Sequence, residues 1–322
     1  MSAVTPARPT VTPEEASAPA RPGRQNGAGA GQSPFPANPA RPGGRAPLAP
    51  QPEGPEGFRR PRPRPAPRRS ANPAVSVIVP TRNEARNLEI VLPAIAAVRP
   101  AVHEVIVVDG NSTDNTVAVA RRTLPWARVI TQTRKGKGNA MACGFTAATG
   151  DVIVMFDADG SADPNEIPAF VNALVKGADF AKGSRFCKGG GSDDITLLRK
   201  SGNAGLNTVA NRLFGTKYSD LCYGYNAFWA DLLPQLELPD PAAPQPEDGS
   251  MIWGDGFEIE TVLNCRVAAA DLTITEVPSV ERERMFGETN LRTFADGTRV
   301  LRTLMAEHRR MEQRRKASGY AR

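Results

Sequence analysis

The sequence is short of the features that mark membrane-spanning, secreted and zinc-binding proteins. Its 322 residues contain no apolar run near the ~18 residues that a membrane-spanning helix needs. The first residues lack the apolar core of a secretory signal. Two histidines and four widely spaced cysteines, without a CxxC pair, argue against a structural zinc site. We therefore expect a cytoplasmic protein with reduced thiols.

Proline and arginine are concentrated in the first 73 residues. This stretch holds 18 of the 30 prolines, with 11 arginines, four glutamates and few large apolar side chains. Such a segment cannot bury enough surface to offset the entropy of ordering, so we predict a disordered tail over residues 1–73. One domain is expected over residues 74–310, followed by a short basic tail over residues 311–322.

The positive charge belongs to the tail and not to the predicted domain. The tail carries a net charge of +7, whereas the other residues carry 29 basic and 30 acidic side chains. A nucleic-acid-binding fold would carry its basic patch on the domain itself, so no specific nucleic-acid partner is expected. The tail could still touch RNA, DNA or anionic lipid through non-specific electrostatics.

Apolar, β-branched runs alternate with helical stretches in the first half of the domain. The predicted strands are Val75–Val79, Glu104–Asp109, Ala127–Thr131, Asp151–Phe156 and Asp179–Lys182. This alternation predicts βαβ units and an α/β fold with a mostly parallel sheet flanked by helices. In such sheets the ligand lies beyond the carboxyl ends of the strands. Asp109, Asp157, Asp159 and Arg185 fall at those ends.

The second half is less regular. We expect an amphipathic helix over Thr196–Phe214, because apolar residues recur there at helical spacing. Further expectations are a surface insertion at Pro239–Gly249, helices over Phe257–Ala269 and Asn290–Arg310, and a strand at Leu272–Val277.

Asp157 and Asp159 are separated by one residue and directly follow a predicted buried strand. Two neighbouring carboxylates repel each other and lose hydration when they are partly buried. A hard divalent cation resolves this cost, and Mg²⁺ or Mn²⁺ typically takes one or two carboxylates together with substrate phosphates. The pair therefore predicts a metal site for a diphosphate substrate.

Polar residues also follow the first two strands, at Pro80–Glu84 and at Asp109–Asp114. A carboxylate at a strand end can accept hydrogen bonds from a ribose hydroxyl or a base N–H, which favours a ligand-binding role for Asp109. Ser112 and Asp114 are typical of turns and helix caps, so a structural role is favoured for both.

Four segments, in this order and at these spacings, carry a family resemblance. VSVIVPTRNE, VIVVDGNSTDNT, VMFDADG and KGSR resemble the family 2 glycosyltransferases of GT-A fold, and among them the polyprenyl- or dolichyl-phosphate sugar synthases. The resemblance covers about Ala74 to Arg310 and implies an inverting transferase of hexosyl type. Its donor would be a nucleotide-diphosphate sugar, its cofactor Mg²⁺ or Mn²⁺, and its acceptor a polyprenyl phosphate.

The resemblance also implies roles for single residues. The nucleotide would contact Pro80, Glu84, Asp109 and Lys137, and the metal and donor diphosphate would contact Asp157 and Asp159. Arg185 would face the acceptor, and Arg284 would hold phosphate on the acceptor side. The segments DLCYGYNAFW and GDGFEIE, beginning at Asp220 and Gly254, would shape the sugar and acceptor pocket.

The sequence departs from the pattern of the lipid-phosphate synthases in two places. After the acidic triplet these enzymes commonly continue with Gln-His-Pro-Pro, whereas this chain has Gly160-Ser161-Ala162-Asp163-Pro164. Ser161 is a poorer metal ligand than the histidine it replaces. The loop Cys187–Asp194 is also unusually rich in glycine. Both differences concern the donor sugar and the acceptor more than the type of reaction.

The nature of the acceptor decides which side chains the reaction needs. A phosphate monoester loses its second proton near pH ~6, so a polyprenyl phosphate needs cations and little base catalysis. A hydroxyl acceptor needs a carboxylate base, for which Asp255, Glu258 and Glu260 are candidates and Glu258 is favoured. The basic segment Arg309–Lys316 and the arginine-rich tail would suit peripheral contact with the cytoplasmic face of a membrane.

Three alternatives to a lipid-phosphate acceptor remain open at this point. A soluble glycosyltransferase would act on a small phosphorylated or hydroxyl acceptor. A nucleotidyltransferase would also use a parallel sheet and a metal, but no glycine-rich phosphate loop follows the first strand. A nucleic-acid-binding protein would rely on the tail and bind in a salt-sensitive way, but it leaves the strand-end carboxylates unexplained.

Overall fold

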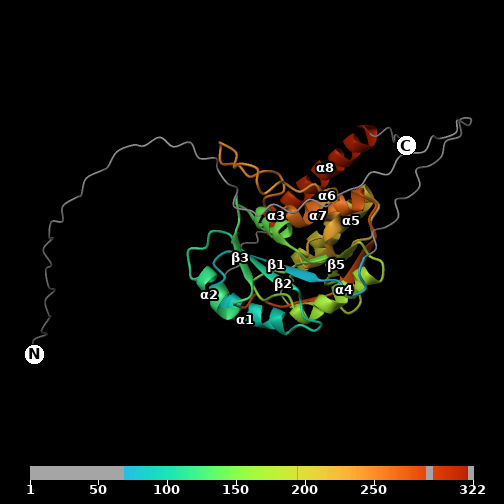
Figure 1. The fold of residues 1–322 in the computed structure, drawn as a ribbon. Coiled ribbons are helices and arrows are strands. Elements are labelled where there is room, and N and C mark those ends of the chain that lie inside the picture. The colour runs from blue at the N-terminus through green and yellow to red at the C-terminus, as the bar shows by residue number, and fades with distance from the viewer. Residues whose placement is uncertain (1–68, 194, 288–292, 318–322) are drawn as a thin grey trace, which may run out of the picture. The chain divides into compact units, whose positions relative to one another are not determined.

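The computed structural model describes residues 69–193, 195–287 and 293–317, which are built around a seven-stranded sheet (Figure 1). The strand order is β3-β2-β1-β4-β7-β5-β8, and β7 runs antiparallel to both of its neighbours. The strands are β1 (Val75–Thr81), β2 (Glu104–Asp109), β3 (Arg128–Thr131), β4 (Val152–Met155), β5 (Phe180–Ser184), β7 (Asn226–Trp229) and β8 (Ile274–Pro278). Two short strands, β6 (Gly191–Ser192) and β9 (Val280–Glu281), pair separately.

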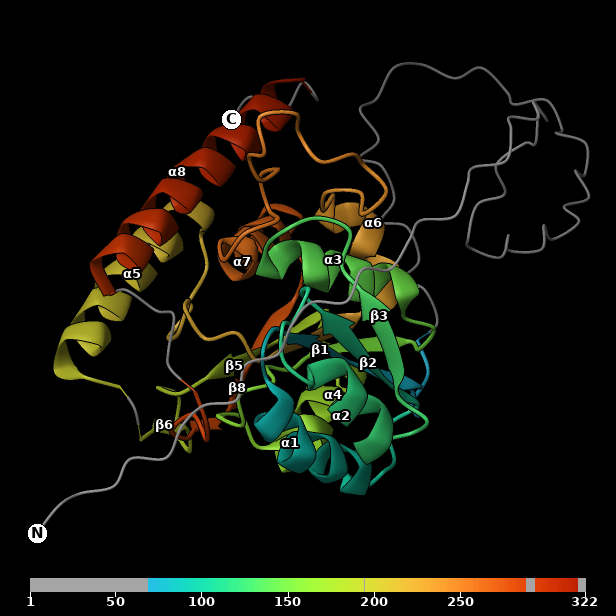
Figure 2. The same cartoon turned by 90° about the vertical axis from the view of Figure 1, so that its left-hand side faces the viewer.

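Helices cover both faces of the sheet. Helices α1, α2 and α4 lie on one face and α3, α6 and α7 on the other, while α5 and α8 run side by side beyond α7 (Figures 1 and 2). Their bounds are α1 (Ala85–Ala97), α2 (Thr116–Thr123), α3 (Lys137–Ala147), α4 (Ile167–Val175), α5 (Leu197–Phe214), α6 (Leu233–Leu236), α7 (Ile259–Ala269) and α8 (Thr293–Ala317), with 3₁₀ turns at Pro164–Glu166 and Ala230–Leu232. Among the helices described, none combines the length and the apolar character needed to cross a membrane.

The central strands are apolar over most of their length because both of their faces are covered. Val77, Ile106 and Ile153, at the centres of β1, β2 and β4, are completely buried. Near-continuous apolar runs are typical of parallel strands with helices on both sides. The predicted mostly parallel α/β sheet is therefore confirmed. The antiparallel strand β7 was not predicted, because its short NAFW run carries no period that separates it from a loop.

The order of the strands creates a switch point between β1 and β4. The chain runs from β1 outward to β2 and β3, returns through α3, and continues at β4 on the other side of β1. Ile78 pairs with Met155, so Pro80 and Asp157 leave neighbouring strands at the same edge. In open α/β sheets this edge, where the connections diverge, is where ligands bind.

The loops after β1 and β2 hold each other in place. Asn83 accepts the backbone N–H of Thr113 at 2.8 Å, and its own N–H donates to the hydroxyl of Ser112 at 2.9 Å. The carboxylate of Asp114 accepts the N–H groups of Thr116 and Ala85, which joins the starts of α2 and α1. Ser112 and Asp114 thus bond to the backbone, the structural role expected from their positions in the sequence.

The ends of the described domain differ from the predicted boundaries. Arg69, which falls within the predicted tail, pairs with Asp179 at 2.5 Å and with Asp231 at 3.2 Å. At the other end, α8 continues through residues 311–317 instead of stopping at Arg310. The remainder of the predicted disordered tail, residues 1–68, lies outside the described residues.

Glu104 ties the starts of the parallel strands together. Its carboxylate accepts hydrogen bonds from the hydroxyl of Ser76 and the N–H of Thr149, and it pairs with Arg128 at 2.9 Å. Burial alone would raise the pKa of Glu104, but these donors lower it to about 2. Because the folded pKa lies below the ordinary value of 4.5, this stabilisation is present above pH 4.5 and is lost as the pH falls toward 2.

We expect Glu104→Gln to flatten the acid limb of the stability curve. Urea unfolding at several pH values between 2 and 7 should show that the wild type loses stability between pH 4.5 and 2 more steeply than the variant. Glu89→Gln, which changes an exposed carboxylate, should leave the wild-type slope unchanged. Equal slopes for Glu104→Gln and wild type would contradict this role of Glu104.

Candidate active site

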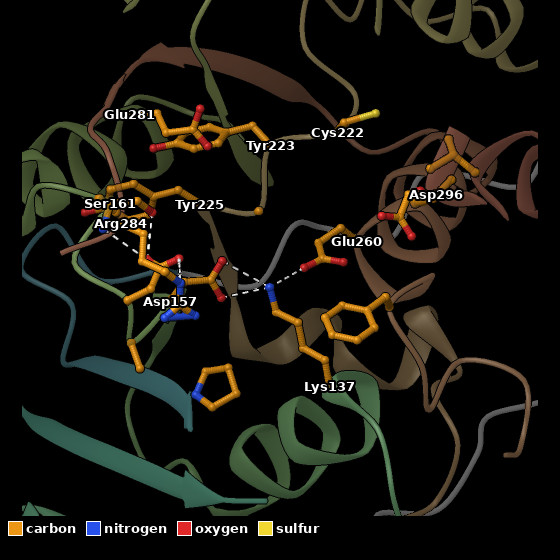
Figure 3. Close-up of a pocket in the computed structure, with 18 of the residues that line it drawn as sticks. Lys137, Asp157, Ser161, Cys222, Tyr223, Tyr225, Glu260, Glu281, Arg284 and Asp296 are labelled. Carbon is orange, nitrogen blue, oxygen red and sulfur yellow. Dashed lines mark hydrogen bonds and ion pairs between the residues drawn. The ribbon is translucent and has the colours of Figure 1, made fainter. Parts of the chain in front are cut away.

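A cavity of about 1010 Å³ opens at the carboxyl ends of the parallel strands, beside the switch point (Figure 3). Seven of the nine predicted site residues line it: Pro80, Glu84, Lys137, Asp157, Asp159, Arg185 and Arg284. They come from segments between β1 and the loop after β9, so the fold brings together residues up to about 200 positions apart. Asp109 and Glu258 are the two that do not line the cavity.

Lys137 lies between two carboxylates on one side of the cavity (Figure 3). It is the first residue of α3, and its Nζ is 2.8 Å from Oδ1 of Asp157 and 2.6 Å from Oε1 of Glu260. Burial would lower the pKa of Lys137, but the charges of Asp157 and Glu260 outweigh burial and raise it. Lys137 is therefore held as a cation between the two carboxylates.

Arg284 links the loop after β1 with the acidic triplet. Its guanidinium donates to both oxygens of Glu84 at 2.7–2.9 Å, and its Nε is 4.0 Å from Oδ2 of Asp159. The other oxygen of Asp159 accepts the N–H and the hydroxyl of Ser161 at 3.0 and 2.8 Å. Burial raises the pKa of Glu84 despite the opposing effects of Asn87 and Arg284.

Arg185 is fixed on the opposite side of the cavity by two carboxylates that the sequence did not indicate. Its guanidinium binds Asp220 through two N–H groups, at 2.6 and 2.8 Å, and Glu281 at 2.9 Å. It also lies 4.9 Å from the centre of the Tyr223 ring. Burial would lower the pKa of Arg185, but Asp220 and Glu281 raise it. These two carboxylates hold the guanidinium in place at the cavity lining.

A buried lysine supports the segment that carries Tyr223. The side chain of Lys182 on β5 is completely buried, and its Nζ donates to the carbonyls of Tyr223 at 2.6 Å and Gly183 at 3.1 Å. Burial lowers the pKa of Lys182 to about 8. The next residue, Gly224, faces Glu260 and Asp157, because a Cβ there would lie 3.3–3.4 Å from their carboxylate oxygens. Lys182 thus positions a backbone wall of the cavity.

Two predicted site residues have structural contacts outside the cavity lining. Asp109 is buried and accepts the N–H of Ser112 at 3.3 Å, which closes the turn after β2. Glu258 accepts the N–H groups of Gly254 and Gly256, at 2.9 and 3.2 Å, in the turn before α7. The carboxylate that reaches the cavity from the first turn of α7 is that of Glu260, although Glu258 was the favoured candidate base.

Asp255 is withdrawn from the cavity by a buried ion pair. Arg134 donates to its two oxygens at 2.7 and 2.9 Å, and the two side chains are 1% and 0% exposed. Arg134 also donates to carbonyls of the Pro239–Gly249 insertion, at residues 240, 241 and 243. This pair fastens the insertion and the turn before α7 against the start of α3.

The start of α3 fits against that turn without room for side chains. The N–H groups of Gly138 and Asn139 donate to the carbonyls of Gly256 and Asp255, at 3.2 and 3.1 Å. A Cβ on Gly138 would lie 1.8 Å from the carbonyl oxygen of Gly254. Gly138, the second glycine of the KGKG segment, therefore allows the close approach that places Lys137 beside Glu260.

The arrangement of acidic side chains fits one mode of metal binding. Within the described part of the chain, no cluster of three or more Asp, Glu, His or Cys side chains is arranged to hold a metal ion. A Mg²⁺ or Mn²⁺ ion that takes two carboxylates and completes its shell with phosphate and water needs no such cluster. Asp157 and Asp159 supply hard oxygen ligands at the cavity wall and suit that mode.

The family model for glycosyl transferase family 2 matches residues 76–236, which include β1 to β7 and the acidic triplet. The chain belongs to this family. The resemblance on which the sequence analysis relied is thereby confirmed.

The chain is similar to other glycosyltransferases over different shares of their length. An uncharacterized glycosyltransferase of Mycobacterium tuberculosis is 43% identical over 115 residues, or 36% of this chain and 50% of the relative, so the match spans half of that protein's length. The undecaprenyl-phosphate mannosyltransferase of Micrococcus luteus is 32% identical over 226 residues, covering 67% of this chain and 87% of the relative.

A solved structure supports the fold. The glucosyl-3-phosphoglycerate synthase of M. tuberculosis, determined with Mn²⁺, UDP and glucosyl-3-phosphoglycerate, superposes with a TM-score of 0.55 at 24% identity. The match covers 74% of this chain and 80% of that one. The predicted GT-A fold is therefore confirmed.

We expect Asp255→Ala to destabilise the domain by about 3–5 kcal/mol, because it leaves the buried guanidinium of Arg134 without its partner. Glu89→Ala is a matched control, since its pair with Arg122 is 52% and 67% exposed. Removing that exposed pair should change stability by less than about 1 kcal/mol. Urea unfolding of both variants measures the difference, and equal losses would show that burial does not govern the Arg134–Asp255 pair.

Proposed function

We propose that this chain transfers a hexose from a nucleotide-diphosphate sugar to a polyprenyl phosphate, with inversion at the sugar carbon. The observation that carries the choice of acceptor is the engagement of the three candidate bases. Asp255 is buried against Arg134, Glu258 accepts two backbone N–H groups outside the cavity lining, and Glu260 pairs with Lys137. An acceptor that arrives already ionised, such as a phosphate monoester, needs no base.

The donor would occupy the side of the cavity formed by β1, α3 and β4. Pro80 and Glu84 would contact the nucleoside, and Lys137 would contact the diphosphate. A divalent cation, Mg²⁺ or Mn²⁺, held by Asp157 and Asp159 would neutralise charge on the departing nucleotide diphosphate. Lys137 and Arg284 would add positive charge at the same place, which would stabilise the leaving group.

The acceptor phosphate would approach from the Arg185 side. Because Asp220 and Glu281 fix the guanidinium in place, Arg185 would orient an incoming phosphate oxygen toward the sugar carbon opposite the departing diphosphate. The new bond forms between this oxygen and the sugar carbon as the bond to the nucleotide diphosphate breaks. Arg284, which lies beside Asp159, is available to either phosphate.

A lipid acceptor is supported by the apolar surface around α5 and α8. Leu206 and Val300 line the cavity between these helices, and Leu197 and Leu198 at the start of α5 are 84% and 56% exposed. Leu301, Met305, Arg302, Arg309 and Lys316 are exposed on α8. Apolar and basic side chains together suit a peripheral contact with an anionic membrane surface. We propose that this contact is with the cytoplasmic face of the membrane. The similarity to an undecaprenyl-phosphate mannosyltransferase supports the same acceptor class.

The first experiment is a transfer assay on the full chain with UDP-, GDP- and other nucleotide sugars, undecaprenyl phosphate in vesicles, and Mg²⁺ or Mn²⁺. We expect a sugar-phosphate lipid, and its formation should fall at least about 100-fold with EDTA or in Asp159→Ala, as for loss of a group that stabilises transition-state charge. Asp248→Ala, in the surface insertion, should retain wild-type activity.

Product analysis by mass spectrometry separates the alternatives. Transfer only to a soluble phosphorylated or hydroxyl compound would refute the lipid acceptor while keeping the transferase. Absence of donor binding and turnover with every nucleotide sugar would refute the proposed reaction.

A pair of glycines on α5 tests where the lipid binds. Gly202 lines the cavity and Gly205 does not, while a Cβ added at either position would meet no atom within 4 Å. We expect Gly202→Trp to raise the KM for undecaprenyl phosphate about tenfold, because blocking contacts of one isoprene unit costs roughly 1–2 kcal/mol. Gly205→Trp should leave KM unchanged, although it places the same side chain on the same helix. Equal effects of the two substitutions would refute binding of the lipid along this side of the cavity.

A further inference from the structure

Lys137 forms an ion pair with Asp157, whose carboxylate the proposed metal site requires. Its Nζ lies 2.8 Å from Oδ1 of Asp157 and 3.0 Å from Oδ2, so both oxygens face the same ammonium group (Figure 3). Glu260 holds Lys137 from the other side at 2.6 Å. The lysine side chain is 17% exposed, so little water screens these contacts. An ammonium in this position repels a divalent cation that approaches the same oxygens.

An anionic ligand would draw Lys137 away from Asp157. The N–H groups of Gly138 and Asn139 at the start of α3 already donate to the carbonyls of Gly256 and Asp255, so they are not available to phosphate. The charge that this end of α3 offers to a diphosphate is therefore the ammonium of Lys137. Its long side chain can exchange partners without any movement of the helix, because its stem is flexible.

We propose that Lys137 and the divalent cation compete for Asp157, and that a nucleotide diphosphate ends this competition by taking Lys137 as its counter-ion. This inference rests on the proposed function, since it assumes the metal site at Asp157 and Asp159. Its consequence is that metal and donor bind cooperatively: each increases the affinity for the other by the same factor. Without donor, Lys137 stays on Asp157 and is held there by Glu260, and metal binding is weak.

The test measures Mn²⁺ binding directly, by electron paramagnetic resonance of the free ion, and does not depend on turnover. A nearby cation lowers the proton affinity of a carboxylate by about 1–3 pKa units, so removing it should strengthen binding of another cation by about tenfold or more. Without nucleotide, Lys137→Met should therefore bind Mn²⁺ about tenfold more tightly than wild type. Lys137→Arg keeps the charge and should remain weak.

The matched control is Lys135→Met. Lys135 lies two residues before Lys137, and its side chain is exposed and outside the cavity lining, so this variant loses the same charge at a different place. It should bind Mn²⁺ as wild type does. Saturating UDP, and GDP in parallel, should increase the Mn²⁺ affinity of wild type by a larger factor than that of Lys137→Met. Mn²⁺–nucleotide association in solution is common to all the proteins and cancels in this comparison.

Lys137→Met leaves Asp157 and Glu260 without their shared cation and is expected to lose stability. A second readout therefore compares each protein with and without Mn²⁺. The increase in melting temperature on adding Mn²⁺ should be larger for this variant than for wild type. If Lys137→Met binds Mn²⁺ no more tightly than wild type, or if Lys135→Met gains as much, the competition is refuted while the metal site stands. If no protein binds Mn²⁺ with or without nucleotide, the metal site fails and the inference fails with it.

Discussion

The pairing of three cations in the cavity, Lys137, Arg185 and Arg284, with carboxylates from distant segments is the constraint on which the rest of the site depends. Among the described residues, six cationic and six anionic side chains line the cavity. A partly buried charge without a partner is costly, so each pair fixes the relative positions of the elements that carry it. Arg284 joins the end of β1 to the segment after β9, and Lys137 joins α3 to β4 and α7.

This self-neutralised cavity also limits what can bind in it. A strongly anionic ligand that binds alone would take the cations away from their carboxylates. Those carboxylates would then be left without a positive partner. A diphosphate that arrives with a divalent cation brings both signs, so the carboxylates and the cations can each exchange one partner for another. The same reasoning makes Lys137 and Asp157 the pair most exposed to exchange, because the carboxylate of Asp157 is 37% exposed whereas Asp220, the partner of Arg185, is buried.

The sequence predicted those parts of the fold that depend on local pattern. The five strands between residues 75 and 184 were found within two residues of their predicted ends, and the clearest of them, β1, β2 and β4, carry the apolar runs typical of buried parallel strands. Strand β7 was missed, since an antiparallel strand inserted between β4 and β5 depends on its neighbours and not on its own period. The short β6–β9 pair was missed for the same reason.

The place of a side chain at the cavity could be predicted where it directly follows a strand, and not where its direction depends on a turn. Asp157 and Asp159 follow β4 and line the cavity, whereas Asp109 ends β2 and turns back to bond Ser112. Glu258 and Glu260 are two residues apart, and only the start of α7 decides which of them reaches the cavity. Asp220 and Glu281, the partners of Arg185, have no local signal, because their role exists only once β5, β7 and β9 are assembled.

The contacts of the three candidate bases, Asp255, Glu258 and Glu260, bear more directly on the type of acceptor than any single cation does. A general base must have an oxygen free to take a proton, and each carboxylate that the sequence offered for this task is engaged by a guanidinium, an ammonium or backbone N–H groups. Glu260 could act as a base only if Lys137 left it. Lys137 would leave it only to bind the donor diphosphate, and this would free Glu260 on the donor side of the cavity and not on the acceptor side. An acceptor oxygen that is already ionised avoids this conflict, and its negative charge would be met by Arg185 and Arg284, which other carboxylates hold in place. The arrangement therefore favours capture of a phosphate over deprotonation of a hydroxyl.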